Sequence, residues 1–346
     1  MKTFRARVLD PRTVIPAVIA FGLLGAVLAV GDPAKVWALT MRAGWPAIAL
    51  VGGLTVPYLA ARGLVWRQLL AQQGARVPMP TFLVAFAAGE FAKDLPGGAY
   101  VEDYLLSRAS VPVAKSVTAT TALSALEAIF ALPFVLVWGV PGWPWLRPAI
   151  EAILAAYVVM IALLWFLTGA GNAQSRRTHS GALQPALHSV QGFLKEARHL
   201  VAWRTIRENL LPTAVYCGIV LFDILLLGRT VGARGLGVRE AAVVFGFITL
   251  SLVLLPIPTS LGVTEASGVG ALVAFGASPA EAVAILLLLR VLLTGTTMFL
   301  TGLVMLSLWG RLPRDLSAAA HESESPRADD HAIVPATTCN ESRVEP

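Results

Sequence analysis

Six long blocks of mainly apolar residues constrain this chain more than any other feature of its sequence. They occupy residues 14–31, 45–66, 116–140, 149–168, 210–228 and 279–309. A membrane-spanning helix needs about 20 such residues, and the last block would form one tilted or protruding helix of about 46 Å. Charged residues make up only 14% of the chain, against about 25% in soluble domains. A soluble globular enzyme is therefore excluded.

Two further apolar segments, 80–113 and 240–278, are interrupted by proline and glycine at the strings LPGGAYVED and LLPIPTSLGVTEASG. The turn residues are Pro96, Gly97 and Gly98 in the first segment and Pro256, Pro258 and Gly262 in the second. Such clusters cannot sustain a helix, and irregular backbone at membrane depth must be enclosed by protein or line a watery cavity. Both segments are therefore predicted to be re-entrant helical hairpins.

The order span, span, hairpin, span occurs twice, in halves at about 14–140 and 149–309. Glu127 lies 25 residues beyond Glu102, and Arg290 lies 25 residues beyond Glu265. Three full spans in one half require the second half to be inverted relative to the first. The sequence thus predicts an all-α polytopic membrane protein with about six full spans and two re-entrant hairpins, or six to eight transmembrane helices. An inverted repeat with interrupted helices is typical of transporters.

Lysine and arginine favour the cytoplasmic side of a membrane, which predicts a cytoplasmic N-terminus at 1–13 and a cytoplasmic loop at 170–209. The loop contains an apolar periodicity that fits either a surface helix or a solvated connector. The tail, 310–346, is polar and aperiodic, so it is predicted to be disordered and cytoplasmic. Three arginines, Arg229, Arg234 and Arg239, would lie outside: either the topology differs there or they meet lipid phosphates.

The second hairpin and the helix after it carry a recognisable combination of residues. In order these are Pro256 and Pro258, then Gly262, Val263 and Glu265, then Gly276 and Pro279, and finally Arg290. This pattern resembles the lysylphosphatidylglycerol synthase transmembrane (flippase-like) family. The first hairpin resembles the family's other motif, but it has Tyr100, Glu102 and Asp103 where members usually have Gly-Glu and then Arg. Any role of that arginine does not carry over.

The resemblance covers roughly residues 10–309 and implies a stand-alone flippase-like protein of the cytoplasmic membrane, because no synthase domain is recognisable. In the best-known members this region moves an aminoacylated phospholipid between leaflets. The expected cargo is a phospholipid or other lipid-like envelope component, and no enzymatic activity is expected. The alternatives are a membrane enzyme, or a non-catalytic partner of a lipid- or glycan-synthesising enzyme. The sequence contains no common catalytic motif that would support an enzyme. It also contains no Walker loop that would support transport driven by ATP hydrolysis.

The candidate substrate-binding residues are the charged side chains expected within the membrane: Glu102, Glu127, Asp223, Glu265 and Arg290. A charge at that depth costs roughly 3 kcal/mol, and a pair between Glu127 and Arg290 would neutralise both. Arg290 is then a candidate ligand of a lipid phosphate. A purely structural pair, Arg290 with either Glu127 or Glu265, is the alternative. Glu102 and Glu265 would meet a cationic headgroup or act as gates.

Other ionisable residues carry weaker signals. Glu90, Lys93 and Asp94 have the spacing of a local salt bridge. The histidines show no ligand spacing, so no metal and no cofactor are expected. The cysteines, Cys217 and Cys339, exclude a disulfide scaffold. The expected partners are membrane lipids with anionic headgroups, and no nucleic acid.

Overall fold

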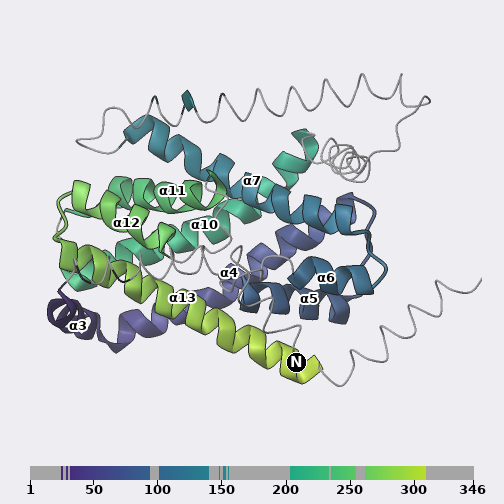
Figure 1. Ribbon diagram of the computed structural model, residues 1–346, viewed down its shortest axis with the longest axis horizontal. Helices are drawn as coiled ribbons and strands as arrows, with labels where there is room; N and C mark the ends of the chain where they lie inside the picture. Colours follow the sequence, from purple (N-terminus) through teal and green to yellow (C-terminus); the bar gives the residue numbers. More distant parts are fainter. Residues whose placement is uncertain are drawn as a thin grey trace, which may run out of the picture.

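The structure, a computed structural model, describes residues 32–93, 101–139, 203–233, 235–254 and 262–308 and a few isolated residues elsewhere. Within those ranges the regular elements are all helices (Figure 1). They are α3 (Pro33–Arg42), α4 (Gly44–Gln72), α5 (Met79–Ala92), α6 (Val101–Arg108), α7 (Val113–Trp138), α10 (Trp203–Val231), α11 (Val238–Leu254), α12 (Val263–Ala274) and α13 (Pro279–Leu308). The predicted all-α architecture is confirmed.

Four of these helices, α4, α7, α10 and α13, are long and apolar enough to cross a bilayer, with mean hydropathies from 1.6 to 2.2 in their most apolar windows. They correspond to four of the six predicted spans. The other two, 14–31 and 149–168, lie largely outside the described residues, as do the N-terminal segment 1–13 and the tail 310–346. The chain is a multi-pass membrane protein.

Helix α10 begins earlier than the sequence predicts, inside the segment assigned to the 170–209 loop. Its first turns are polar, but Arg204 Nε lies 2.7 Å from Glu208 Oε1 one turn further on. Such a pair at i and i+4 supports a helix, and Asn209 also donates to the Thr205 carbonyl at 2.8 Å. The span therefore continues beyond its apolar part. The rest of the loop lies outside the described residues.

Each predicted hairpin consists of two short helices on either side of its proline-glycine segment. The first pair is α5 and α6, with 14 and 8 residues, and the second is α11 and α12, with 17 and 12 residues. At about 1.5 Å per residue, none of them reaches the ~30 Å of the hydrocarbon core. The two pairs lie at opposite ends of the molecule (Figure 1). Their lengths fit the re-entrant prediction.

The two central spans, α4 and α10, are antiparallel and have the same length of 29 residues. Gln72, at the end of α4, donates to Glu208, near the start of α10, at 3.0 Å. Tyr58 and Tyr216, each near the middle of its helix, meet edge to face with ring centroids 5.9 Å apart. The halves that contain these helices therefore run in opposite directions, as the predicted inversion requires.

The packing of the helices is preserved when the two halves are exchanged. In the first half α5 packs on α6, and in the second half α11 packs on α12. Across the halves, α7 packs on α11 and α13 packs on α5. Likewise, α4 contacts α13 while α10 contacts α7. This correspondence indicates an approximate twofold axis that passes near the Tyr58–Tyr216 contact.

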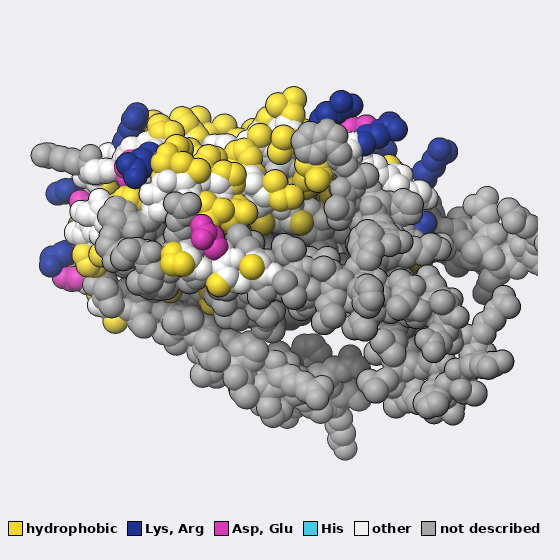
Figure 2. All heavy atoms as spheres, turned by 90° about the horizontal axis from the view of Figure 1, so that it is seen from above, with side chains coloured by type: hydrophobic (Ala, Val, Ile, Leu, Met, Phe, Trp, Pro, Cys, Tyr) yellow, Lys and Arg dark blue, Asp and Glu magenta, His cyan; other side chains and the backbone are white. Residues whose placement is uncertain are grey.

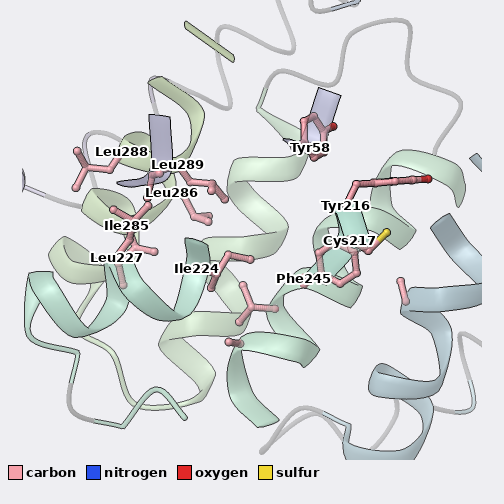
Figure 3. Packing of buried hydrophobic residues seen from close by; sticks show 14 of the residues in the cluster. Tyr58, Tyr216, Cys217, Ile224, Leu227, Phe245, Ile285, Leu286, Leu288 and Leu289 are labelled. Carbon is pink, nitrogen blue, oxygen red and sulfur yellow. The ribbon is translucent and has the colours of Figure 1, made fainter. Parts of the chain in front are cut away.

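The core draws on both halves, with Tyr58 from α4, Tyr216, Ile224 and Leu227 from α10, and Ile285 from α13 (Figure 3). The outer surface is apolar too, and Figure 2 shows hydrophobic side chains between two groups of lysines and arginines. Large apolar side chains of the described helices are strongly exposed, among them Leu211 at 74% and Leu306 at 75%. A soluble monomer rarely exposes such a surface, so this belt faces lipid.

One close approach fixes how the halves interlock. Gly246 of α11 faces α7, where a Cβ atom would lie 2.6 Å from Val135 Cγ2 and 3.0 Å from the carbonyl oxygen of Ala131. A real side chain does not fit against that backbone atom without moving a helix. Glycine is therefore required at this crossing for steric reasons.

We expect Gly246→Val to destabilise the protein by about 1–3 kcal/mol through overpacking. Thermal unfolding of the detergent-solubilised protein, followed by tryptophan fluorescence, measures the change. The control is Gly53→Val, since a Cβ at Gly53 has no heavy atom within 4 Å. Equal losses in the two variants would show that the crossing is not the cause.

Candidate functional site

Arg62, near the middle of the membrane span α4, links three helices through two ion pairs. Its Nε lies 2.9 Å from Glu90 Oε1 of α5, and its Nη1 lies 2.9 Å from Glu127 Oε1 of α7. Nη1 also donates to the Tyr58 hydroxyl at 3.3 Å. The side chain of Glu90 is 5% exposed and that of Arg62 is 18% exposed. A charged centre thus lies within apolar helices but is not fully closed.

Lys93 completes this centre, which we call the Arg62 cluster: Arg62, Lys93, Glu90 and Glu127. The Lys93 ammonium group pairs with Glu90 Oε2, which confirms the predicted local salt bridge, while Asp94 lies outside the described residues. Lys93 also lies over the Tyr58 ring, 6.0 Å from its centroid. Two cations and two carboxylates make the cluster formally neutral, as a group at membrane depth requires.

Glu102, the second residue of α6, lies beside the same helices. Its Oε1 accepts a hydrogen bond of 2.8 Å from Thr120 of α7, whose hydroxyl in turn accepts one of 3.2 Å from Trp66 of α4. Gly89 of α5 makes room for it, because a Cβ there would lie 2.8 Å from Glu102 Cβ. Among the described residues, no cation pairs with this carboxyl group.

The second half contains a separate ion pair between Glu265 of α12 and Arg290 of α13, with 3.1 Å between Oε1 and Nη1. Glu265 Oε2 also accepts from the Gly262 backbone N–H at 2.7 Å and from the Thr264 hydroxyl at 2.8 Å. Glu265 therefore caps its own helix. Gly262 has φ of 86°, a left-handed conformation that favours glycine. The other predicted turn residues, Pro96, Gly97, Gly98, Pro256 and Pro258, lie outside the described residues.

The predicted pair between Glu127 and Arg290 is wrong. Glu127 pairs with Arg62 instead, and Arg290 pairs with Glu265, which was the structural alternative. The physical reason is proximity: α12 and α13 pack on each other within the second half, as α4 and α7 do within the first. Both ion pairs therefore form within one half and not across the two halves.

Sequence reasoning missed Arg62 as a site residue. It lies only four residues before Trp66, at the end of the apolar block 45–66, where a charged residue is expected at the membrane surface. The helix continues to Gln72, however, and its 29 residues place Arg62 well inside the span. An ionisable residue inside a span is a functional candidate by default, and that signal was available.

Asp223 stands apart from both charged groups. It is completely buried in α10, and neither of its carboxyl oxygens has a hydrogen-bond partner among the described residues. No ion pair joins it to Arg62 or Arg290. Of the five predicted site residues, the structure thus brings Glu127 into the Arg62 cluster, places Glu102 beside it, and joins Glu265 to Arg290, but leaves Asp223 separate.

The described residues hold no group of three or more His, Cys, Asp or Glu side chains arranged to bind a metal ion. The Arg62 cluster and the Glu265–Arg290 pair contain guanidinium, ammonium and carboxylate groups. The substrate-binding role expected of the charged residues within the membrane stays a prediction.

Comparison with known families agrees with the pattern in the second hairpin. The family model described as "Lysylphosphatidylglycerol synthase TM region" matches residues 14–302. That range contains the Arg62 cluster, Glu102 and the Glu265–Arg290 pair. No curated protein and no solved structure matches the chain.

We expect Arg62→Met to destabilise the fold by about 3–5 kcal/mol, because removing one partner leaves buried carboxylates uncompensated. The combination Arg62→Met, Glu127→Gln should recover part of that loss, since Glu90 keeps Lys93 and the other orphaned charge is gone. Thermal unfolding in detergent measures both variants. Additive losses would contradict the ion-pair assignment.

Proposed function

Since the chain belongs to the lysylphosphatidylglycerol synthase transmembrane-region family, we propose that it moves a lipid between the two leaflets of the membrane it spans. The cargo is a phospholipid or another lipid-like component of the cell envelope. The membrane is the cytoplasmic one, with both termini in the cytoplasm. The protein makes and breaks no covalent bond in this process.

The observation that carries this proposal is that the Arg62 guanidinium group has one nitrogen without a partner among the described residues. Its Nε and Nη1 face carboxylates, whereas Nη2 has no hydrogen bond or ion pair among the described residues. The side chain is also 18% exposed. Guanidinium groups bind phosphate through two parallel N–H donors. Arg62 therefore retains a donor for a headgroup phosphate at a depth where water is scarce.

The carboxylates around Arg62 offer a way to release that headgroup again. Because Glu90 and Glu127 already neutralise Arg62, a lipid phosphate competes with them rather than meeting a bare cation. Such exchange keeps binding weak enough for transport in either direction. Lys93, 30% exposed, provides a second cation for the same phosphate, so anionic headgroups are the preferred ligands.

Glu102 extends the recognition to cargo that also carries a positive charge. Its Oε1 is held by the Thr120 hydroxyl at 2.8 Å, and no described cation neutralises it. A cationic group on the headgroup would find its counter-charge there while the phosphate lies at Arg62. The Glu265–Arg290 pair, in contrast, has a structural role in holding α12 against α13.

The test uses purified protein in liposomes that contain fluorescent phospholipids with different headgroups. Dithionite added outside quenches only the probes exposed in the outer leaflet, so the slow phase measures flipping. The wild type should flip lipid, and Arg62→Gln should slow it about 10- to 100-fold, the worth of one charge-assisted hydrogen bond.

Two further variants keep the result interpretable. Arg67→Gln makes the same chemical change five residues along α4, at an exposed position, and should flip lipid like the wild type. Arg290→Gln should reduce the thermal stability more than the flipping rate of the remaining folded protein. No flipping of any phospholipid by folded wild-type protein would refute a phospholipid cargo. Equal effects of the Arg62 and Arg67 variants would refute the role of Arg62.

A further inference from the structure

Helix α10 carries four buried polar side chains along one of its faces: Asn209, Thr213, Tyr216 and Asp223. Their exposed fractions are 0%, 0%, 1% and 0%. At about 100° per residue, these positions fall within roughly 80° of the helix circumference. We call them the α10 polar stripe. They are buried even though much of α10 outside the stripe is apolar enough to contact lipid.

Each member of the stripe has an oxygen atom without a hydrogen-bond partner in the part of the chain that the structure describes. These atoms are Asn209 Oδ1, Thr213 Oγ1, the Tyr216 hydroxyl and both carboxyl oxygens of Asp223. Buried polar groups nearly always have a hydrogen-bond partner, because leaving one without a partner is energetically costly. Four exceptions on one face of one helix therefore call for a function that uses them.

Asp223 is the member with the highest cost, because a bare carboxylate cannot stay buried without a counter-charge. The described helices packed against α10 are α3, α4, α7, α11 and α13. Their charged or titratable side chains are Lys35, Arg42, Tyr58, Arg62, Arg67, Lys115, Glu127, Arg239, Glu240, Glu281 and Arg290. Those on α10 itself are Arg204, Arg207, Glu208, Tyr216, Cys217 and Arg229. None of them forms an ion pair or hydrogen bond with Asp223.

We propose that Asp223 is a proton-binding site that couples lipid movement to a proton gradient, with the α10 polar stripe leading toward it. The proton adds to a carboxyl oxygen from the aqueous phase on one side and leaves to the other side, with no other bond changed. This inference rests on the proposed function, since it supplies the energy for that same movement.

The geometry favours a proton over a metal cation such as sodium. A sodium ion needs several oxygen ligands around one point. Tyr216 lies seven residues from Asp223, which is two helical turns or about 10.5 Å along the axis. The stripe therefore cannot gather its oxygens around one ion, whereas a proton needs only the carboxyl group.

A path of contacts connects the stripe to the Arg62 cluster. The Tyr216 ring meets the Tyr58 ring edge to face at 5.9 Å, and the Tyr58 hydroxyl accepts from Arg62 Nη1 at 3.3 Å. Figure 3 shows the two tyrosines at one side of the core, with Ile224, the neighbour of Asp223, further along α10. A change of charge and packing at Asp223 thus reaches the headgroup site through α10 and α4.

The experiment measures lipid flipping in liposomes with equal pH on both sides and with an imposed pH difference of either sign. In the wild type, the gradient should produce net accumulation of the fluorescent lipid in one leaflet. Asp223→Asn should retain exchange at equal pH and lose the accumulation. Asp223→Glu, which keeps a proton-binding group, should retain both. Thr297→Val removes another buried oxygen without a partner, on α13, and should behave like the wild type.

A second measurement follows the proton itself. Infrared difference spectra of the wild type between acidic and alkaline pH should contain the C=O band of a carboxylic acid that is absent in Asp223→Asn. Gradient-driven accumulation by Asp223→Asn, or none by the wild type, would overturn the coupling and leave the proposed function standing if exchange persists. Absence of lipid exchange in the wild type under every condition would overturn both the proton coupling and the proposed function.

Discussion

A charge at membrane depth has to be neutralised where it lies, and in this chain two carboxylates neutralise the charge of Arg62. Its two ion pairs, to Glu90 and to Glu127, join α4 to α5, the first helix of the α5–α6 pair, and to the span α7. Hydrophobic attraction does not hold helices together in lipid, so packing and polar contacts must do so. The position of α5, and with it that of Glu102 packed against Gly89, depends on this bridge.

The two halves use the same architecture for unequal chemistry. In the second half, Glu265 at the start of α12 is paired with Arg290 and caps its own helix. In the first half, the corresponding Glu102 accepts a hydrogen bond from the Thr120 hydroxyl. The arginine of this half, Arg62, lies on the preceding span α4 and pairs with Glu90 and Glu127 instead. The glutamate of α12 is therefore paired with a cation, whereas the corresponding glutamate of α6 has only a hydroxyl partner among the described residues.

The fold could be predicted from the sequence because a bilayer leaves few choices. Apolar length located the described spans, and the proline and glycine clusters after Lys93 and Leu254 located the hairpins, since irregular backbone is otherwise excluded at that depth. The ion pairs could not be predicted in the same way. Glu127 and Arg290 occupy equivalent positions along the chain, but an ion pair forms only between residues of helices that pack on each other. Arg62 could not be recognised as a residue within the membrane because Trp66 marked the apparent end of its span. The α10 polar stripe could not be recognised because apolar residues separate its members along the sequence.

The crossing of α7 on α11 and of α5 on α13 has a consequence for how the protein is made. Helix α5 ends at Ala92 and α13 begins at Pro279, so the ribosome adds nearly 190 residues before α5 meets its partner. At about 5–20 residues per second, that takes roughly 10–40 s. Throughout this interval α5 has been synthesised but its partner from the second half has not. The contact between α5 and α13 therefore forms only when translation of the described helices is nearly complete.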